Sequence, residues 1–333
     1  MPLVVVGGRL HPCGIELLRK APGIELDYVE EVSIEALAPR IPGADAILLR
    51  TQPLTAETID GCPNLRIVSR HGVGYDAVDV ESLNRRGIPL AIVGDVNSRS
   101  VAEHAMMLML AAGRRLLCYD AATRDGDWDY RNSLEAREMF SKSLLIVGFG
   151  RIGRCLAQIA SAFGLRVSAY DPYLSGPPAS GEVRMVDDLG AALADADFIS
   201  IHIPGTDKPI LGPDNIALLK PTAVVVNTAR GGAADEQALA DALRENRLLG
   251  VGIDVYSSEP PGAGNPLTGL KRAVLTPHSA GMTLESAARM AHSAARNIID
   301  FFNGRLDPAL VANRDAIGIE ACRGIGAGAR AER

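Results

Sequence analysis

The chain has 333 residues, of which 47% are hydrophobic and 22% are charged, and its formal net charge is −6. A chain of this length favours two domains, and this composition is ordinary for a globular protein. The negative net charge and the absence of Lys/Arg runs interleaved with aromatic residues argue against a nucleic-acid partner, and no apolar segment is long enough to cross a bilayer.

The N-terminal segment MPLVVVGGRLHP has no basic stretch leading into an apolar core of signal-peptide length. Five scattered cysteines without CxxC spacing predict reduced thiols rather than a disulfide framework or a zinc site. These features favour a cytoplasmic protein with no membrane partner and no bound metal. The cysteines are Cys13, Cys62, Cys118, Cys155 and Cys322.

Short β-branched runs alternate with helical patterns along nearly the whole chain, which is typical of parallel sheets with helices on both faces. One series of strands is expected before residue 100, and a second series begins at residue 144. The predicted strands are 3–6, 24–29, 46–50, 65–69 and 89–93 in the first series, and 144–150, 166–171, 197–204, 223–229, 248–255 and 273–277 in the second.

Two helical segments stand out from the pattern. Residues 100–116 are apolar around most of the helix circumference, which predicts burial on several sides, between domains or between subunits. The last convincing helix covers 284–304, with Gly304 as its stop. The final residues, GIGAGARAER, are small in composition, and we expect them to be poorly ordered.

The segment LLIVGFGRIGRCLAQIA contains Gly148, Gly150 and Gly153 in the spacing GxGxxG, after an apolar strand and at the start of a helix. In a dinucleotide-binding loop the first glycine permits a tight turn, the second lets the backbone approach a pyrophosphate, and the third lets the helix pack on the strand. The helix N-terminus then presents free N–H groups to the phosphates. The alternative is a purely structural turn.

Asp171 lies at the end of the next predicted strand, 23 residues after Gly148. A carboxylate at this position can accept hydrogen bonds from an adenosine ribose and would repel a 2′-phosphate. The residues DPYLSG supply no arginine to replace it. The sequence therefore favours NAD(H) over NADP(H), the alternative being a surface aspartate.

Polar residues follow three later strands of the second series. Arg230 comes after one strand in VVVNTARGG, Asp254 and Glu259 after the next in GIDVYSSEPP, and His278 after the last in VLTPHSAG. Because ligands of open α/β sheets bind beyond the carboxyl ends of the strands, we expect these segments to converge on the dinucleotide crevice.

An arginine, a glutamate and a histidine form a coherent set for hydride transfer to a keto carbon. A histidine can donate the proton that the new alkoxide needs, and a neighbouring carboxylate favours imidazolium and orients the ring. An arginine can hold the substrate carboxylate and polarise the carbonyl. Each residue also has a simpler alternative: a surface ion pair for Arg230, a turn residue for Glu259 and a core imidazole for His278.

The segments GFGRIG, YDP, NTARGGAADEQAL, GIDVYSSEPP and LTPHSAGMT resemble the signature segments of the D-isomer-specific 2-hydroxyacid dehydrogenases, over roughly residues 40–313. Within that family the chain is most similar to the phosphoglycerate dehydrogenase and hydroxypyruvate reductase branch. The resemblance implies a catalytic trio in which His278 is the acid–base, Glu259 is its partner and Arg230 binds substrate. With the glycine loop, it places the cofactor site at Gly148, Gly150, Arg151, Ile152, Gly153, Asp171, Ile203, Pro204, Thr228, Ala229, Arg230, Asp254, His278, Ala280 and Gly281.

The resemblance also implies a domain arrangement. A Rossmann-type dinucleotide-binding domain, residues 100–283, would be inserted into a discontinuous flavodoxin-like substrate domain made of residues 1–99 and 284–333. Family members usually pair as homodimers through the cofactor domain. The chain ends soon after the closing helix, so we expect no regulatory extension of the kind that some phosphoglycerate enzymes carry.

The segment SRHGVGYDAVD, residues 69–79, resembles the family's substrate loop, in which the backbone N–H groups of Val73 and Gly74 would hold the substrate carboxylate. Arg50, Arg70 and His71 match positions that face the far end of the substrate in the phosphoglycerate branch. Two cations there would favour an anionic or polar tail, as in phosphohydroxypyruvate or hydroxypyruvate. The alternative is that these arginines pair with surface carboxylates.

Two rival functions remain open at the level of sequence. One is formate or phosphite oxidation on the same scaffold, although the extra segments specific to those enzymes are not found here. The other is an NAD(H)-responsive, corepressor-like binding protein with little turnover. The latter also keeps the trio of Arg230, Glu259 and His278, so consumption of NADH with 2-keto acids is the observation that separates it from a dehydrogenase.

Overall fold

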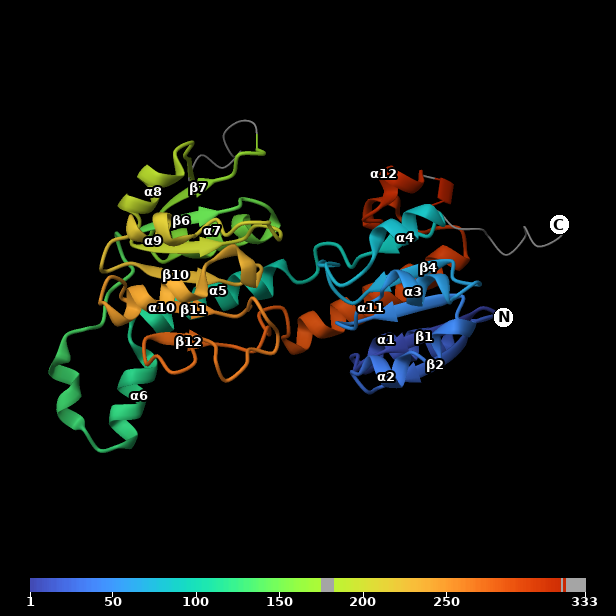
Figure 1. Cartoon of the computed structure of the whole chain (residues 1–333), viewed down its shortest axis with the longest axis horizontal. Coiled ribbons are helices and arrows are strands. Elements are labelled where there is room, and N and C mark those ends of the chain that lie inside the picture. The colour runs from blue at the N-terminus through green and yellow to red at the C-terminus, as the bar shows by residue number, and fades with distance from the viewer. Residues whose placement is uncertain (175–182, 319, 322–333) are drawn as a thin grey trace. The chain divides into compact units, whose positions relative to one another are not determined.

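The computed structural model describes residues 1–174, 183–318 and 320–321 (Figure 1). The C-terminal segment GIGAGARAER and the last two residues of DPYLSG lie outside these residues. The chain divides into two compact units. Unit 1 contains Met1–Asn97 and Leu284–Arg333, and unit 2 contains Ser98–Thr283. Unit 2 therefore begins two residues before the expected start of the inserted domain at residue 100. Among the described residues, no helix combines the length and apolar character that a membrane span requires.

Unit 1 is built on a five-stranded parallel sheet with the order β2-β1-β3-β4-β5. This is the flavodoxin-like strand order, so the predicted class of this sheet is confirmed. Its strands are β1 (Leu3–Gly7), β2 (Glu25–Val29), β3 (Ala46–Leu49), β4 (Ile67–Arg70) and β5 (Leu90–Ala91).

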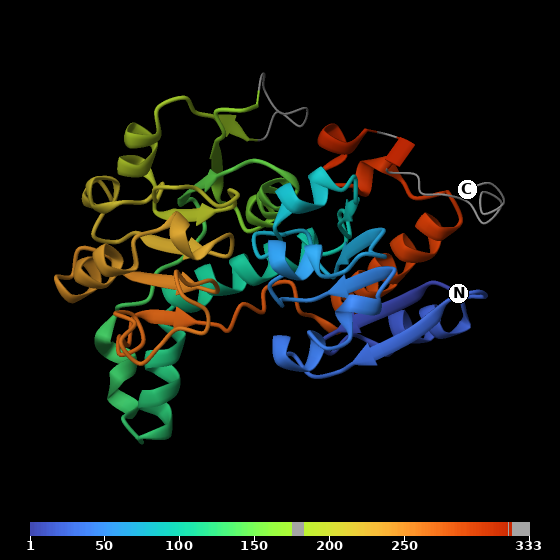
Figure 2. The same ribbon diagram turned by 45° about the vertical axis from the view of Figure 1, so that its right-hand side comes forward.

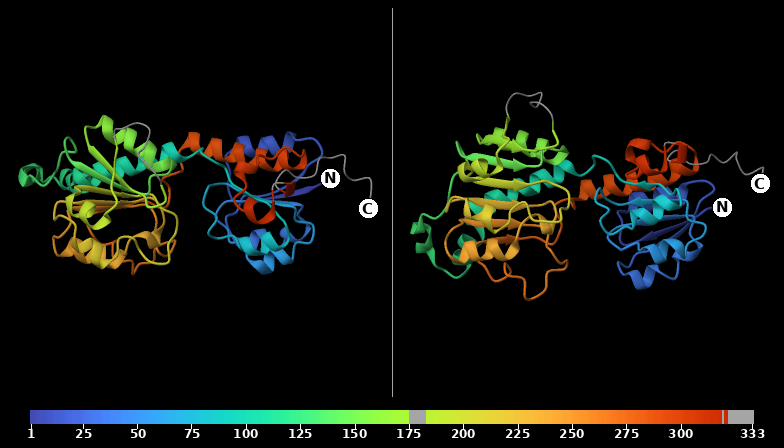
Figure 3. Two further views of the ribbon diagram at one scale, coloured as in Figure 1. Left: turned by 90° about the horizontal axis from the view of Figure 1, so that it is seen from above. Right: turned by 45° about the horizontal axis from the view of Figure 1, so that its top comes forward.

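Helices cover both faces of this sheet (Figure 3). Successive residues of β1 point to opposite faces, so Val4 and Val6 pack with α1 and α11, whereas Val5 packs with α2, α3 and α4. The helices of the first face are α1 (Pro12–Lys20) and α11 (Leu284–Phe302), and those of the second are α2 (Ile34–Leu37), α3 (Ala56–Asp60) and α4 (Val80–Arg85). The short elements η1 (Ile41–Gly43), η4 (Pro308–Leu310) and α12 (Arg314–Ile317) complete the unit.

Unit 2 contains a seven-stranded parallel sheet with the order β12-β11-β10-β9-β6-β7-β8. The strand order reverses between β6 and β9, as in a Rossmann fold, which places the expected ligand crevice at their carboxyl ends. The strands are β6 (Ser143–Val147), β7 (Arg166–Tyr170), β8 (Arg184–Met185), β9 (Phe198–Ile201), β10 (Val224–Asn227), β11 (Gly250–Ile253) and β12 (Ala273–Leu275). The fold class predicted from the sequence is confirmed in both units.

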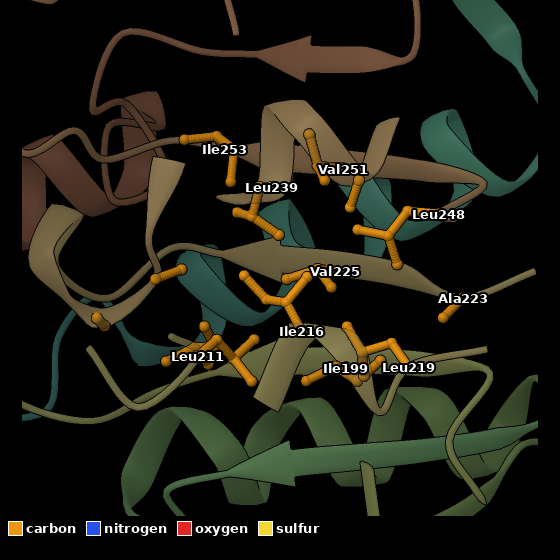
Figure 4. Close-up of a cluster of buried hydrophobic side chains, with 14 of the residues drawn as sticks. Ile199, Leu211, Ile216, Leu219, Ala223, Val225, Leu239, Leu248, Val251 and Ile253 are labelled. Atoms are coloured by element: carbon orange, nitrogen blue, oxygen red, sulfur yellow. The ribbon is translucent and has the colours of Figure 1, made fainter. Parts of the chain in front are cut away.

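The helices α8 (Leu189–Asp195), α9 (Pro213–Ala217) and α10 (Glu236–Arg244) cover one face of this second sheet. Figure 4 shows the core beneath them, in which Ile199, Val225 and Val251 from three adjacent strands meet Ile216 and Leu239 from α9 and α10. These side chains are almost completely buried, which explains why the strands of this sheet are continuously apolar.

The helices α5 (Ser98–Gly113) and α7 (Arg151–Ala162) cover the opposite face, and α5 lies beside β10, β11 and β12 (Figures 1 and 2). Packing on α7 and on these strands buries most of the circumference of α5. Much of its apolar surface is therefore covered within unit 2, and the expectation that this helix lies between domains or subunits stays a prediction. The elements α6 (Leu116–Arg124), η2 (Trp128–Ser133) and η3 (Gly231–Ala233) complete the unit.

Candidate active site

The glycine loop joins β6 to α7 in a shape that two of its glycines require. Gly148 has a φ of +93°, and a Cβ there would lie 2.5 Å from the carbonyl oxygen of His202. A Cβ at Gly153 would lie 2.4 Å from the carbonyl oxygen of Gly148, so α7 packs directly on the loop. Among the described residues, a Cβ at Gly150 would meet nothing within 4 Å, and no side chain caps the start of α7. Open space therefore adjoins the free N–H groups of the helix.

Asp171, at the end of β7, holds this loop through its carboxylate. One oxygen accepts a 2.9 Å hydrogen bond from the N–H of Phe149, and the other accepts a 3.1 Å bond from the N–H of Tyr173. The side chain is half-buried and ties the end of β7 to the turn after β6. Of the two other loop residues in the expected cofactor site, Arg151 is exposed and Ile152 is half-buried.

The loop after β10 is shaped by Asn227. Its Oδ1 accepts the N–H of Ala229 at 3.0 Å, and its Nδ2 donates to the carbonyl oxygen of Arg230 at 2.8 Å. The Arg230 guanidinium donates to the carbonyl oxygen of Ala229 at 2.7 Å. A Cβ at Gly231 would lie 1.9 Å from the carbonyl carbon of Tyr256, so the backbone here packs tightly on the loop after β11.

His278 and Glu259 are in direct contact. Nδ1 of the imidazole lies 2.6 Å from Oε2 of the carboxylate, whose other oxygen accepts the N–H of Tyr256 at 3.0 Å. The side chains of His278 and Glu259 are 54% and 37% exposed, which excludes a core imidazole. His278 adopts a left-handed backbone with a φ of 49°, a conformation that histidine tolerates better than most residues.

Asp254 lies beneath the loop that carries His278 and is completely buried. Its Oδ1 accepts the hydroxyl of Thr276 at 2.6 Å and the N–H of Ser279 at 2.9 Å, and its Oδ2 accepts the N–H of Ala280 at 2.9 Å. Its carbonyl oxygen accepts the N–H of His278 at 2.8 Å. The family resemblance places this aspartate in the cofactor site, and the geometry adds that it anchors the histidine loop.

Other residues of the expected cofactor site surround these loops. Thr228 is buried, and its Oγ1 has no hydrogen-bond partner in the described part of the chain. After β9, Ile203 is half-buried and Pro204 is exposed, whereas on the histidine loop Ala280 is buried and Gly281 is half-buried.

His202 lies directly after β9. Its Nε2 lies 2.8 Å from the hydroxyl of Ser200. Burial lowers the pKa of His202 to about 3, so its ring is neutral at neutral pH.

In unit 1 the predicted substrate loop follows β4. Arg70 donates from Nε to the carbonyl oxygen of Gly74 at 2.8 Å and from a terminal nitrogen to that of Leu49 at 3.4 Å. Its side chain therefore shapes the turn that carries Val73 and Gly74, both of which are half-buried.

Arg50 and His71 lie beside this loop at the ends of β3 and β4. Burial, followed by the charges of Arg50 and Arg70, lowers the pKa of His71 to about 4. The Nε2 atom of His71 is buried and has no partner among the described residues. Arg50 donates to the carbonyl oxygen of Arg9 at 3.1 Å, and burial lowers its pKa.

Gln52 belongs to this region and was missed by the sequence reasoning. It is 4% exposed, and its Oε1 accepts the N–H groups of Arg50 and Thr51, each at 3.1 Å. Its Nε2 is buried, with no partner within the described residues. A glutamine two residues beyond an apolar strand was the only available signal.

Two further observations bear on the location of the site. A cavity of about 520 Å³ lies between β7, β8 and α8, and it is lined by none of the predicted site residues. Across residues 1–174, 183–318 and 320–321, no group of three or more His, Cys, Asp or Glu side chains could hold a metal ion.

Comparisons with known proteins agree with this geometry. The sequence model described as "D-isomer specific 2-hydroxyacid dehydrogenase, NAD binding domain" matches residues 106–280, more than half of the chain. The glyoxylate reductase of Thermococcus gammatolerans is 34% identical over 330 residues, covering 96% of this chain and 98% of that protein. The solved structure of the TT0316 protein from Thermus thermophilus matches with a TM-score of 0.84 and 31% identity, covering 91% of this chain and 97% of that one.

The D-3-phosphoglycerate dehydrogenase of Mycobacterium bovis is 38% identical over 304 residues. That match covers 90% of this chain and 56% of the relative, so the chain spans little more than half the length of such relatives. The fold and the site define an α/β protein with a dinucleotide-binding unit. The chain belongs to the D-isomer-specific 2-hydroxyacid dehydrogenase family.

Proposed function

We propose that the chain is an NAD-dependent dehydrogenase that transfers hydride between NAD(H) and a small 2-keto or 2-hydroxy acid, with the D configuration at C2. The observation that carries the proposal is the 2.6 Å contact between His278 and Glu259 at the carboxyl edge of a Rossmann sheet. A half-exposed imidazole held by a carboxylate is the proton donor and acceptor that such a reaction requires.

In this mechanism His278 exchanges a proton with the substrate oxygen. Its Nδ1 faces Glu259, so Nε2 is the nitrogen left for the substrate. The Glu259 carboxylate keeps the ring oriented. It also stabilises the imidazolium form of His278 until the imidazolium donates its proton to the substrate oxygen. Arg230, on the loop after β10, binds the substrate carboxylate and polarises the carbonyl.

The residues of unit 2 suit NAD(H), and we assign this unit the role of cofactor domain. The space beside Gly150 and the uncapped start of α7 fit a pyrophosphate, and the orphaned Thr228 hydroxyl fits a polar cofactor group. Asp171 retains lone pairs for a ribose and would repel a 2′-phosphate, which favours NAD(H) over NADP(H). The bound dinucleotide supplies or accepts the hydride.

Unit 1 is assigned the role of substrate domain. The N–H groups of Val73 and Gly74 hold the substrate carboxylate, and Arg50, Arg70 and His71 face its tail. The two arginines lie close enough to His71 for their charges to lower its pKa, which supports a positive region at this sheet edge. We therefore expect a polar or anionic tail, as in hydroxypyruvate or phosphohydroxypyruvate.

We also propose that the protein works as a cytoplasmic homodimer that pairs through unit 2. Large apolar side chains are exposed on and around α6 and η2. Exposed apolar side chains gathered in one region often mark a protein–protein interface. Leu116, Leu117, Trp128 and Leu134 are 55%, 46%, 70% and 81% exposed.

The function is tested by following NADH absorbance at 340 nm with glyoxylate, hydroxypyruvate and phosphohydroxypyruvate, and by chiral analysis of the products. Consumption with at least one acid and a D product is expected. Binding of NADH without consumption of any 2-keto acid would contradict the proposal and favour a sensor.

The tail-binding role is tested with Arg70→Ala in the same assay. We expect KM to rise about tenfold or more for phosphohydroxypyruvate, since one charge-assisted contact is lost. Because Arg70 also bonds to Gly74, glyoxylate, which has no tail, controls for distortion of the loop. An equal loss with glyoxylate would contradict the tail-binding role.

A further inference from the structure

Three side chains of unit 2 form a chain of hydrogen bonds behind the loop that carries His278. Nε2 of His104, on α5, lies 3.0 Å from Oγ1 of Thr276, just after β12. That hydroxyl lies 2.6 Å from Oδ1 of Asp254, just after β11. The His104 side chain is 16% exposed and the Asp254 side chain 1%, so little water competes for these bonds.

The direction of each bond follows from a count of protons. Thr276 has one hydroxyl proton, and the Asp254 carboxylate can only accept, so that proton points to Asp254. The Thr276 oxygen must then accept from His104, which fixes the Nε2–H tautomer of this ring. Burial lowers the pKa of His104, and the negative charge of Asp254 raises it by a smaller amount. The net effect is a lowered pKa, so the ring is neutral at neutral pH.

Asp254 in turn fixes the backbone of the histidine loop. Its carboxylate accepts the N–H groups of Ser279 and Ala280, and its carbonyl accepts the N–H of His278. The left-handed backbone at His278 is unfavourable for an L-residue and must be offset by such anchors.

We propose that His104 and Thr276 are positioning residues that orient the Asp254 carboxylate and thereby hold His278 in its reactive place. The inference rests on the proposed catalytic role of His278. Without the Thr276 hydroxyl, the carboxylate loses its shortest hydrogen bond and keeps those from the N–H groups of Ser279 and Ala280. Nε2 of His104, 3.5 Å from Oδ1, is then no longer linked to the carboxylate through a hydroxyl, so the carboxylate is less firmly oriented. Neither His104 nor Thr276 needs to touch the substrate for this effect.

Four variants and one control separate positioning from general destabilisation. Thr276→Val removes the hydroxyl at nearly constant shape, and Thr276→Ser restores it. His104→Leu removes the donor, and His104→Gln keeps an N–H at similar reach. His292→Gln is the control, because His292 is exposed on α11 of unit 1.

The first measurement is hydrogen–deuterium exchange of the protein without substrate. In Thr276→Val and His104→Leu we expect exchange in residues 276–283 to rise about tenfold, while residues 224–227 of β10 stay protected. Thr276→Ser, His104→Gln and the control should stay near wild type. Unchanged exchange in residues 276–283, or an equal rise in β10, would overturn the inference.

The second measurement is steady-state turnover with a keto acid that the wild type reduces. In Thr276→Val and His104→Leu we expect kcat to fall about tenfold, KM and NADH-binding stoichiometry to stay constant, and the solvent isotope effect on kcat to rise as proton transfer slows. A parallel fall in kcat and NADH stoichiometry would show a loss of folded protein and contradict positioning. A wild type without turnover would refute the proposed function, whereas the exchange result stands without it.

Discussion

At the residue scale, the contact between Glu259 and His278 determines which imidazole nitrogen can react. Nδ1 is 2.6 Å from the carboxylate, and Nε2 has no partner among the described residues of unit 2. A neutral ring therefore keeps its proton on Nδ1 and offers a lone pair at Nε2, and an imidazolium offers Nε2–H. The same nitrogen can thus act as base in oxidation and as acid in reduction.

Replacing Glu259 by Gln removes the charge and preserves the shape of the side chain. We expect kcat/KM to fall by about 10- to 100-fold, because imidazolium loses its stabilising partner. The melting temperature should change little, since both side chains are partly exposed. The matched control is Glu245→Gln, which breaks the exposed pair with Arg247 at 2.7 Å and should leave kcat/KM unchanged. Equal activity of the two variants would contradict the role of Glu259.

His71 makes stability depend on pH. Its pKa is about 4 in the folded protein and near 6.5 in an unfolded chain, so the unfolded state binds more protons between these values. Its contribution is fully present above pH 6.5 and is lost as pH falls toward 4. Between pH 7 and 5 we expect the free energy of unfolding to fall by about 1–2 kcal/mol more in wild type than in His71→Gln. Urea titrations at both pH values measure this difference; His292→Gln should behave as wild type, and an equal pH dependence in His71→Gln would refute the assignment.

At the element scale, the site is made of loops that follow parallel strands and are held together by close packing and hydrogen bonds. The loop after β10 packs on the loop after β11 at Gly231. The loop after β12 is held by hydrogen bonds to Asp254, which lies just after β11. Because β10, β11 and β12 pair in a fixed register, these contacts fix the positions of the loops that carry Arg230, Glu259 and His278. The glycines and buried polar groups of the loops are therefore as necessary to the site as its charged residues.

Gly231→Ala tests this close packing. Its Cβ would lie 1.9 Å from the carbonyl carbon of Tyr256, so the two loops must separate. We expect a loss of about 1–3 kcal/mol in the free energy of unfolding and a fall in kcat/KM of at least about tenfold. Gly232→Ala is the matched control, since its Cβ would meet nothing within 4 Å. If the two variants had the same melting temperature and activity, the packing argument would fail.

Sequence patterns predicted most strands because both faces of each sheet are covered, which leaves continuous apolar runs such as Val224–Val226. The two-residue strand β8 has no such run and was not predicted. The burial of α5 was predicted, but its packing on α7 and on β10, β11 and β12 was not, because an apolar circumference does not say which elements cover it.

The positions of Glu259 and His278 could be expected to converge because parallel strands end at one edge. The His104–Thr276 bond could not, because 172 positions separate its partners and it depends on how α5 packs on the sheet. Gln52 likewise belongs to no sequence motif. It is recognised as a candidate site residue only because its side chain is buried and its Nε2 has no hydrogen-bond partner among the described residues.

At the scale of the whole molecule, an exposed apolar segment distinguishes unit 2. Trp128 and Leu134 lie close in sequence near η2, and both are more than two-thirds exposed. We expect light scattering after size exclusion to give the mass of two chains for wild type and of one chain for the double variant Trp128→Glu, Leu134→Glu. Phe163→Glu is the control, since Phe163 is exposed at the end of α7. A monomeric wild type would refute the dimer.

The role of His278 in proton transfer is tested by single-turnover reduction of a keto acid by His278→Asn with saturating NADH. Asparagine tolerates the left-handed backbone at this position, so the loop should keep its shape. We expect NADH to bind as tightly as in wild type and the rate of its oxidation to fall by about a hundredfold or more. Oxidation at the wild-type rate would contradict the central claim that this imidazole exchanges the proton.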